Sequence, residues 1–353
     1  MALRQMTYMG CVAAVVAGGL GAAAPSDAVG RHDVHPGESI QRAVDAARPG
    51  DTVVLAPGVY QESVLIHTSG VQLVGSGAKT VIKPAGTRAG NACGQSGNGI
   101  CVLGRADHPL QNVKIASLTV LGFKKSGIWA SGTDRLSVHD VTARKNGVWG
   151  IAQERSTRTA IRDSDAAENG DAGIFLANMV DQEGGATDTR GAEIRHNNLR
   201  DNRIGLTVRR VRNLTVVDNA MSGNCAGMFV VGDESRPRAG ALTVRDNDVS
   251  HNNKYCPKNP RLPFLQGSGI VLTGTEKALV SHNSVRDNVG KSPLSGGIVL
   301  FPSFVKAPNE NNVIADNFLH GNQPANLINA DTAGKGNRFV RNMCQPSEPG
   351  RTC

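Results

Sequence analysis

Aromatic residues are scarce in this sequence: they make up 4% of its 353 residues, whereas glycine occurs 42 times. This composition argues against a compact α/β enzyme built on aromatic packing and favours a turn-rich β structure. The formal net charge is +8, but no run of basic residues is longer than the pair Arg209 and Arg210. A nucleic-acid-binding patch is therefore not expected. A basic surface suits contact with an acidic polysaccharide or a cell envelope.

The sequence also lacks an apolar segment of membrane-spanning length. Its most apolar stretch, CVAAVVAGGLGAAA, is too short and too rich in small residues to cross a bilayer. It follows the positive charge of Arg4 and precedes the small-x-small pattern of Ser26, Asp27 and Ala28, which together predict a signal peptide over residues 1–28. We therefore expect a secreted protein in which residues 29–353 form one domain.

Metal-type cysteine spacing such as C-x-x-C is absent. Of seven cysteines, Cys11 lies in the predicted signal peptide, which leaves an even number in an exported chain. They fall into three local pairs, for which we predict disulfides; free thiols or a metal site are the alternatives. The predicted pairs are Cys93–Cys101, Cys225–Cys256 and Cys344–Cys353.

An internal repeat runs through most of the chain, as in LTVVDNAMSGN, Leu214 to Asn224. An apolar residue is followed three positions later by Asn, and a second Asn follows five positions after the first. A Gly and an apolar residue precede each copy, which makes the shortest repeat about 22 residues long. Each repeat holds three short segments that alternate apolar and polar residues, the pattern of half-buried strands. The clearest anchor pairs are Ile194/Asn197, Val216/Asn219, Val244/Asn247, Val280/Asn283 and Ile314/Asn317.

Three strands per repeat in a fixed register predict a coil that stacks on itself at strand spacing. The tight turn between the second and third strands needs one residue with positive φ, a conformation that Asn tolerates. Stacked Asn side chains are then expected to hydrogen-bond from coil to coil.

This I-x-x-N-x-x-x-x-N…G-I pattern resembles the right-handed parallel β-helix repeats of the pectate-lyase-like superfamily. The segment ESIQRAVDAARPGDTVVLAPGVYQESVLI is similar to the usual start of that fold. The resemblance, from His35 to Arg341, implies an all-β, single-stranded right-handed parallel β-helix of about ten coils with an N-terminal capping helix. It does not imply one activity, because this architecture serves many chemistries. The helix face expected to cover the core comprises Ile40, Ala43, Val44 and Ala47.

Insertions locate a candidate binding face, because extra residues in a repeat go to loops. The longest are Met179–Arg190, Gly232–Gly240 and Asn253–Ser268, and all flank the strand that begins with Gly and an apolar residue. Strand alternation turns four aromatic side chains outward on that face, where sugar rings could stack on them. The alternative is that the insertions fold back and bury these side chains. The four are Trp129, Phe175, Phe229 and Phe301.

Charged candidates for catalysis lie on the same face and its walls. A lyase that acts on a uronic acid needs a cation for the carboxylate and a base, for which Arg209 and Lys254 are candidates. A hydrolase needs two carboxylates, which Glu154, Asp181 and Asp233 could supply. A solvated or ion-paired surface role is the alternative for each of these residues.

A row of acidic and histidine residues precedes the first Asn of each repeat. Such a row could hold a divalent cation such as calcium or zinc, but Asp beside a tight turn commonly accepts hydrogen bonds from turn N–H groups. We therefore expect a structural role and no cofactor, with calcium as the alternative. The row comprises Asp140, Asp163, His196, Asp218, Asp246, His282 and Asp316.

Motifs that would settle the activity are absent. The chain has neither the Asp-Asp and Gly-His-Gly signatures of polygalacturonases, nor Arg-x-Pro-x-x-Arg of pectate lyases, nor Asp-Pro-His-Asp of alginate epimerases. The sequence predicts a secreted monomer that binds and cleaves a polysaccharide of the uronic-acid type, as a lyase or hydrolase. The alternative is a non-catalytic envelope, adhesin-like or carbohydrate-binding module. An accessory role resembling nitrous oxide reductase maturation proteins is disfavoured, because no Cys, Met or His cluster suggests copper handling.

Overall fold

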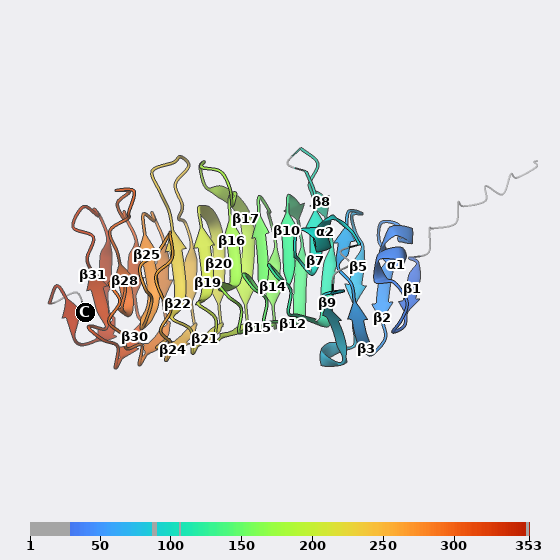
Figure 1. Ribbon diagram of the computed structural model, residues 1–353. Helices are drawn as coiled ribbons and strands as arrows, with labels where there is room; N and C mark the ends of the chain where they lie inside the picture. The colour runs from blue at the N-terminus through green and yellow to red at the C-terminus, as the bar shows by residue number, and fades with distance from the viewer. Residues whose placement is uncertain (1–28, 87–89, 106, 351–352) are drawn as a thin grey trace, which may run out of the picture.

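The chain folds into one elongated stack of coils (Figure 1). The computed structural model describes residues 29–86, 90–105, 107–350 and 353. The predicted signal peptide, residues 1–28, lies outside the described residues and stays a prediction. Among the described residues, no helix is long and apolar enough to cross a membrane.

Three parallel strand stacks form the walls of the coil. The first contains β1 (Arg31–Val34), β2 (Thr52–Leu55), β5 (Gln72–Val74), β9 (Lys114–Leu121), β12 (Ser137–Arg144), β14 (Ala160–Arg162), β17 (Thr187–Arg195), β20 (Val211–Val217), β23 (Thr243–Arg245), β26 (Leu279–Ser281), β29 (Val313–Ala315) and β32 (Arg338–Val340). The second contains β3 (Gly58–Gln61), β6 (Thr80–Lys83), the ends of β9 and β12, β15 (Asp165–Ala167), β18 (Asn198–Arg200), β21 (Ala220–Ser222), β24 (Asp248–Ser250), β27 (Ser284–Arg286), β30 (Phe318–His320) and β33 (Met343–Cys344).

The third stack carries the strands that begin with Gly and an apolar residue. Its 11 described strands correspond to the predicted coils, which were expected to number about ten. They are β4 (Val64–Ile66), β7 (Ile100–Leu103), β10 (Ile128–Ser131), β13 (Ile151–Glu154), β16 (Ala172–Ala177), β19 (Ile204–Arg209), β22 (Ala226–Val231), β25 (Ser268–Thr273), β28 (Gly296–Leu300), β31 (Leu327–Asn329) and β34 (Ser347–Glu348). The remaining elements are β8 (Leu110–Gln111), β11 (Thr133–Asp134), α1 (Ile40–Ala46), α2 (Ala92–Gln95) and the 3-10 turn η1 (Gly77–Lys79).

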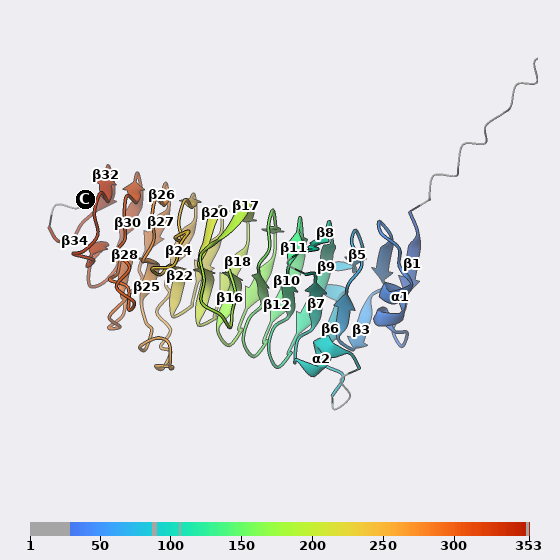
Figure 2. The same ribbon diagram turned by 90° about the horizontal axis from the view of Figure 1, so that it is seen from above.

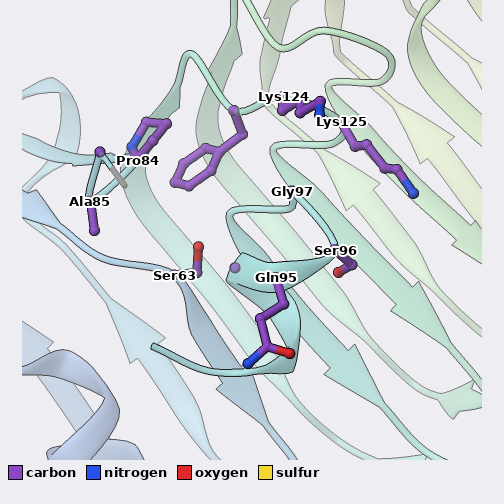
Figure 3. A pocket seen from close by; sticks show the side chains of 11 residues that line it. Ser63, Pro84, Ala85, Gln95, Ser96, Gly97, Lys124 and Lys125 are labelled. Carbon is purple, nitrogen blue, oxygen red and sulfur yellow. The ribbon is translucent and has the colours of Figure 1, made fainter. Parts of the chain in front are cut away.

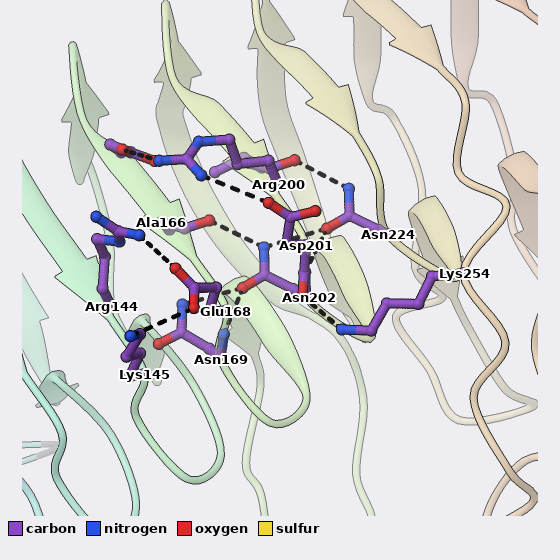
Figure 4. Close-up of polar contacts among 12 residues, drawn as sticks. Arg144, Lys145, Ala166, Glu168, Asn169, Arg200, Asp201, Asn202, Asn224 and Lys254 are labelled. Atoms are coloured by element: carbon purple, nitrogen blue, oxygen red, sulfur yellow. Dashed lines mark hydrogen bonds and ion pairs between the residues drawn. The ribbon is translucent and has the colours of Figure 1, made fainter.

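The asparagines form the predicted ladders inside two corners of the coil. Asn219 is 1% exposed, and its Nδ2 donates to Asn247 Oδ1 at 3.0 Å and to Ile194 O at 2.9 Å. Figure 4 shows the second ladder, in which Asn202 Nδ2 donates to Asn224 Oδ1 at 3.2 Å. The side-chain amides thus bind carbonyls that the turning backbone leaves without a strand partner.

The position of the left-handed residue differs from the prediction. Positive φ falls on the residue before each first Asn, for example Asp218 at φ 54°, and not on the Asn. The physical reason is that Asn219 must point inward to join its ladder, so the preceding exposed residue takes the strained turn. Asp and some His side chains tolerate this conformation better than bulky residues, which explains the Asp and His row.

Helix α1 lies at the end of the stack where the sequence predicts a helix (Figure 1). Ser39 Oγ accepts a hydrogen bond from Arg42 N, and Glu62 Oε1 accepts one from Ile40 N at 2.6 Å. Both Ile40 and Val44 are fully buried in the main core. The expected capping role of this helix stays a prediction.

All three predicted disulfides are present, between Cys93 and Cys101, Cys225 and Cys256, and Cys344 and Cys353. The alternatives of free thiols or a cysteine metal site are therefore excluded for these six residues. The Cys225–Cys256 bond joins the start of β22 to the loop before β25. Figure 2 shows that loop projecting from the same side of the stack as α2.

Candidate functional site

The outer face of the third stack is divided into two halves. One row of outward-pointing residues runs along this face, with one residue from each successive strand. The row comprises Trp129, Ala152, Phe175, Thr207 and Phe229. Beyond Phe229, the row is covered by the protein's own loops, whose side chains form a second apolar cluster with the floor. This cluster includes Phe229, Val271, Val299 and Leu265, with Leu262 and Phe301 packed against it.

Burial corrects the predicted aromatic platform. Phe229 is 3% exposed beneath the loop before β25, and Phe175 is 4% exposed, so neither presents an open stacking face. Trp129 and Phe301 keep partial exposure, but they lie in different halves of the face. The folded-back insertion, which was the alternative expectation, therefore holds for Phe175 and Phe229, because apolar loop residues find their best burial on this floor.

The open half carries a stack of three aromatic rings. The ring centroids of Trp129 and Trp149 are 5.8 Å apart, and those of Trp149 and Phe175 are 4.3 Å apart with planes at 11°. The indole Nε1 of Trp149 donates to Asp171 Oδ2 at 3.0 Å, which fixes the ring. Sequence reasoning missed Trp149 because it examined outward strand positions, whereas Trp149 is a corner residue before Gly150.

A pocket of about 370 Å³ opens beside these rings. Both indoles line it, and each is partly exposed, so the pocket has an aromatic wall. Its polar side chains include the carboxylates of Glu154 and Asp181 and the ammonium of Lys125. Two of the five predicted catalytic candidates therefore meet in one pocket, together with a cation that was not predicted.

Glu154 is held in place by three donors. It is 7% exposed, and its Oε1 accepts hydrogen bonds from Ser131 Oγ at 2.9 Å and from Arg155 Nη2 at 2.6 Å. Its Oε2 accepts from Val180 N at 2.8 Å. Asp181 differs, because it is exposed and has no hydrogen bond or ion pair within the described part of the chain. The pocket thus combines a fixed carboxylate with a free one.

Arg209 lies behind the pocket rather than in it. Its Nη1 donates to Val180 O at 3.1 Å, and burial, followed by repulsion from Arg210 and Arg261, lowers the pKa of its guanidinium. A second outward row contains Glu154, Ala177 and Arg209 on three successive strands. Glu154 and Arg209 are therefore two strands apart, as expected from the sequence. Arg209 therefore positions the pocket wall and does not face the space beside Glu154.

The two remaining candidates are not brought to the pocket. Asp233 is 5% exposed and forms an ion pair with Arg210, which also pairs with Glu183. Lys254 is exposed over a corner of the coil, where its Nζ donates to Asp201 O at 2.7 Å (Figure 4). Asp201 precedes β19 and Arg209 ends it, so the strand length of roughly 17 Å separates the two ends. The predicted Arg209 and Lys254 pair does not form.

Asp171 is a further titratable group beside the aromatic stack. Burial raises the pKa of its carboxyl, while the Trp149 N–H and the charges of Arg203 and Arg261 act in the opposite direction. Desolvation is the largest of these effects because the carboxylate loses water without gaining a direct ion pair. The sequence contained a signal for Asp171, namely its position at a coil corner three residues before Ile174. Lys125 occupies the equivalent position, three residues before Ile128.

Comparison with known proteins supports the fold. The family model "Right handed beta helix region" matches residues 69–241. This chain has the fold of a right-handed parallel β-helix. The mannuronan C-5 epimerase AlgE6 A-module of Azotobacter vinelandii is similar at 20% identity and TM-score 0.59, over 86% of this chain and 88% of that chain.

Two further structures share the β-helix at low identity. DFA-IIIase from Arthrobacter chlorophenolicus in complex with DFA-III has 16% identity and TM-score 0.58, over 88% of this chain and 83% of that chain. The periplasmic alginate epimerase AlgG has 15% identity and TM-score 0.57, over 84% and 70%. No curated protein sequence matches the chain. At these identities the likeness shows the fold alone.

A second family model, "Periplasmic copper-binding protein (NosD)", matches residues 181–345 of the β-helix. Among the described residues, no group of three or more His, Cys, Asp or Glu is arranged to hold a metal ion. In the Asp and His row, His196 instead lies between two carboxylates, with its Nε2 3.4 Å from Asp218 Oδ2 and its Nδ1 3.6 Å from Asp163 Oδ1.

A neighbouring pocket of about 310 Å³ is lined in part by Gly94 and Gln95 of α2 (Figure 3). It is lined by Ser63, Gln95 and Lys124, and it shares Ser96 and Lys125 with the pocket beside the indoles. Phe123, which also borders it, is 3% exposed. The described residues that line this second pocket therefore include no carboxylate and offer little aromatic surface.

Proposed function

We propose that this β-helix protein binds a polysaccharide in the pocket beside Trp129 and Trp149 and processes it there. The observation that carries the proposal is the meeting of two partly exposed indoles with Glu154 and Asp181 in one pocket. Aromatic faces bury the apolar face of a sugar ring, and the polar groups at its edge fix its orientation. Support comes also from the similar structures, which include a mannuronan epimerase and an alginate epimerase.

The pocket chemistry is compatible with acid and base catalysis. Glu154 is fixed by its donors, whereas Asp181 is free to move a proton or contact a sugar hydroxyl. Two carboxylates serve glycoside hydrolysis when one is protonated. For β-elimination from an acidic sugar, Lys125 can neutralise the substrate carboxylate and a pocket carboxylate can take the adjacent proton. Cleavage by either route is part of the proposal.

The test incubates residues 29–353 with mannuronan, polygalacturonate and neutral glucans. New reducing ends report hydrolysis, absorbance of unsaturated ends reports elimination, and proton NMR of the polymer reports epimerisation, which leaves chain length unchanged. Binding is measured separately by calorimetry. We expect Glu154→Gln and Asp181→Asn each to lower turnover at least about 100-fold, and Trp129→Ala to weaken binding.

Matched controls separate the pocket from the rest of the surface. Glu234→Gln removes an exposed carboxylate outside the pocket, and Phe304→Ala removes an aromatic ring that is 64% exposed on another loop. Both controls should behave as the unmodified protein. Equal effects of Glu234→Gln and Asp181→Asn would contradict the assignment of the pocket. Activity should survive chelation, since no cofactor enters the proposal.

A non-catalytic binding module is the second candidate. The observation in its favour is that loops of the protein fill half of the outer face. Binding in the calorimeter without any product in the three activity assays would favour this candidate. The proposal also places the protein outside the cytoplasm, in the periplasm or the medium, in line with the periplasmic families and structures it resembles.

A further inference from the structure

The pocket beside the indoles is bounded at both ends along the coil axis. Toward the N-terminus it ends at Ala92 and Cys93 of α2, which the Cys93–Cys101 disulfide fixes to β7. Toward the C-terminus it ends at Val180 and Asp181. These two residues belong to the strap, which we define as residues 178–186 between β16 and β17. A polymer lying along the third stack would meet a wall on each side.

The strap is fastened at several points. Val180 N donates to Glu154 Oε2 at 2.8 Å, and Val180 O accepts from Arg209 Nη1 at 3.1 Å. Asn178, which is 1% exposed, donates through Nδ2 to Gly184 O at 2.9 Å and closes the strap on itself. These contacts hold the strap in place, so it forms a fixed wall of the pocket.

The base of the strap also packs closely on the next loop. Ala186 N donates to Pro237 O at 2.7 Å. A Cβ on Gly185 would lie 2.1 Å from Arg236 O, so only glycine allows this approach. The strap is thus supported by the loop after β22 as well as by the strands.

No open floor continues beyond the strap. Thr207 is 8% exposed, and the next members of the row, Phe229 and Val271, are 3% and 1% exposed beneath the loop before β25. That loop is fixed by the Cys225–Cys256 disulfide. A sugar chain that left the pocket in this direction would find no further partly exposed aromatic ring in the described part of this row, since the next member after Val271 is Val299.

The dimensions of the pocket agree with a short ligand. The strand residues that line it belong to β7, β10 and β13, three adjacent coils that span roughly 10 Å. Its volume of about 370 Å³ lies near the lower end of the range for small-molecule pockets, about 300–1,000 Å³. A polymer interior needs a groove that is open at both ends, which this geometry does not provide.

We infer that the pocket binds the end of a glycan chain, or a short oligosaccharide, and does not bind the interior of a polymer. The inference rests on the proposed function, since it names the class of glycan that the same pocket takes. The α2 wall and the strap decide this specificity, because they close the two directions in which a longer chain would extend. Cleavage, where it occurs, then releases small products from a chain end.

The test uses calorimetry with mannuronan and polygalacturonate, each intact and as purified oligosaccharides from the disaccharide upward. An end-binding pocket gives a constant number of bound protein molecules per chain, whatever the length. Affinity per chain stays within about threefold across the series, and a disaccharide displaces the protein from the polymer. A number of sites that rises in proportion to chain length overturns the inference, while it leaves the proposed function intact.

A second measurement uses the strap itself. Replacing residues 179–185 with a short Gly-Ser link opens one end of the pocket, and we expect binding sites per polymer chain to increase in this variant. Circular dichroism and the thermal midpoint establish that the variant is folded. If the variant does not fold, the length series on the unmodified protein still decides the question. Absence of binding to every member of both series defeats the proposed function, and the inference with it.

Discussion

Glu154 and Arg209 hold the same residue of the strap from two sides, because Glu154 Oε2 accepts from Val180 N at 2.8 Å and Arg209 Nη1 donates to Val180 O at 3.1 Å. Two strand positions separate them, with Ala177 between. Both hydrogen bonds to Val180 therefore depend on the strap lying over Ala177. The partly buried guanidinium of Arg209 thereby supports the pocket wall.

Removal of this support should loosen the strap. We expect Arg209→Met, which keeps much of the apolar length, to weaken glycan binding about tenfold, as for the loss of one charge-assisted hydrogen bond. Hydrogen exchange should accelerate at residues 178–186. The control is Arg162→Met, which alters an exposed arginine paired with Asp163 on the first stack. Unchanged exchange in the strap would contradict the positioning role of Arg209.

The asparagine ladder should carry much of the stability of the coil. Asn219→Ala removes the donor to Asn247 Oδ1, Ile194 O and Val217 O in a buried corner. We expect the free energy of unfolding to fall by about 3 kcal/mol, because buried acceptors lose their partner. Urea denaturation followed by circular dichroism measures the change.

The residue beside that ladder gives an independent check. Asp218 has φ 54°, so Asp218→Asn should change the free energy of unfolding by less than about 0.5 kcal/mol. Asp218→Val should destabilise by about 1–2 kcal/mol, since a β-branched residue resists positive φ. Equal stability of the Asn and Val variants would show that backbone strain does not select this position.

The pH dependence of stability should carry the signature of Asp171. Its pKa is raised in the folded state by burial, so the folded protein holds a proton that the unfolded chain releases near pH 3.9. The contribution of Asp171 is therefore fully present below that pH and is lost as pH rises through the folded-state pKa. In Asp171→Asn, which retains an acceptor for Trp149 Nε1, unfolding free energy should rise relative to the unmodified protein over this window. Urea titrations at a series of pH values test the difference, and equal stability of the two proteins across the window would contradict the assignment to Asp171.

The disulfide beside the filled half of the face should protect its loop. Replacing both Cys225 and Cys256 with Ser should lower the free energy of unfolding by about 2–4 kcal/mol. It should also make residues 253–267 sensitive to limited proteolysis, because the loop would lose its covalent link and be held only by apolar contacts and by hydrogen bonds such as Arg203 Nη1 to Pro257 O. The matched control replaces Cys344 and Cys353, which form a disulfide far from this loop in the sequence. Proteolysis of the loop in the control variant alone would contradict this account.

The sequence by itself determined the fold, the register and the disulfides, because these follow from short-range patterns. The spacing from Val216 to Asn219 and Asn224 repeats once per coil, and each copy must place an amide in the same corner to satisfy turning backbone groups. The six cysteines fall into three pairs of near neighbours along the sequence, and this proximity predicted the three disulfides. The left-handed residue was assigned one position late, because φ follows the direction of the side chain and not only its preference.

Only the tertiary structure decided which outward residues are accessible. Phe229 and Trp129 occupy equivalent positions in the row, yet one is covered by Leu262 and Leu265 and the other lines a pocket. The packing of the loops causes this difference in exposure. The repeat pattern does not show which outward residues an insertion covers. Trp149 and Asp171 lie at coil corners, where the alternation of inward and outward side chains along a strand does not apply. Residues that share a periodic environment are predictable from one copy to the next, whereas contacts between insertions occur once and depend on the complete fold.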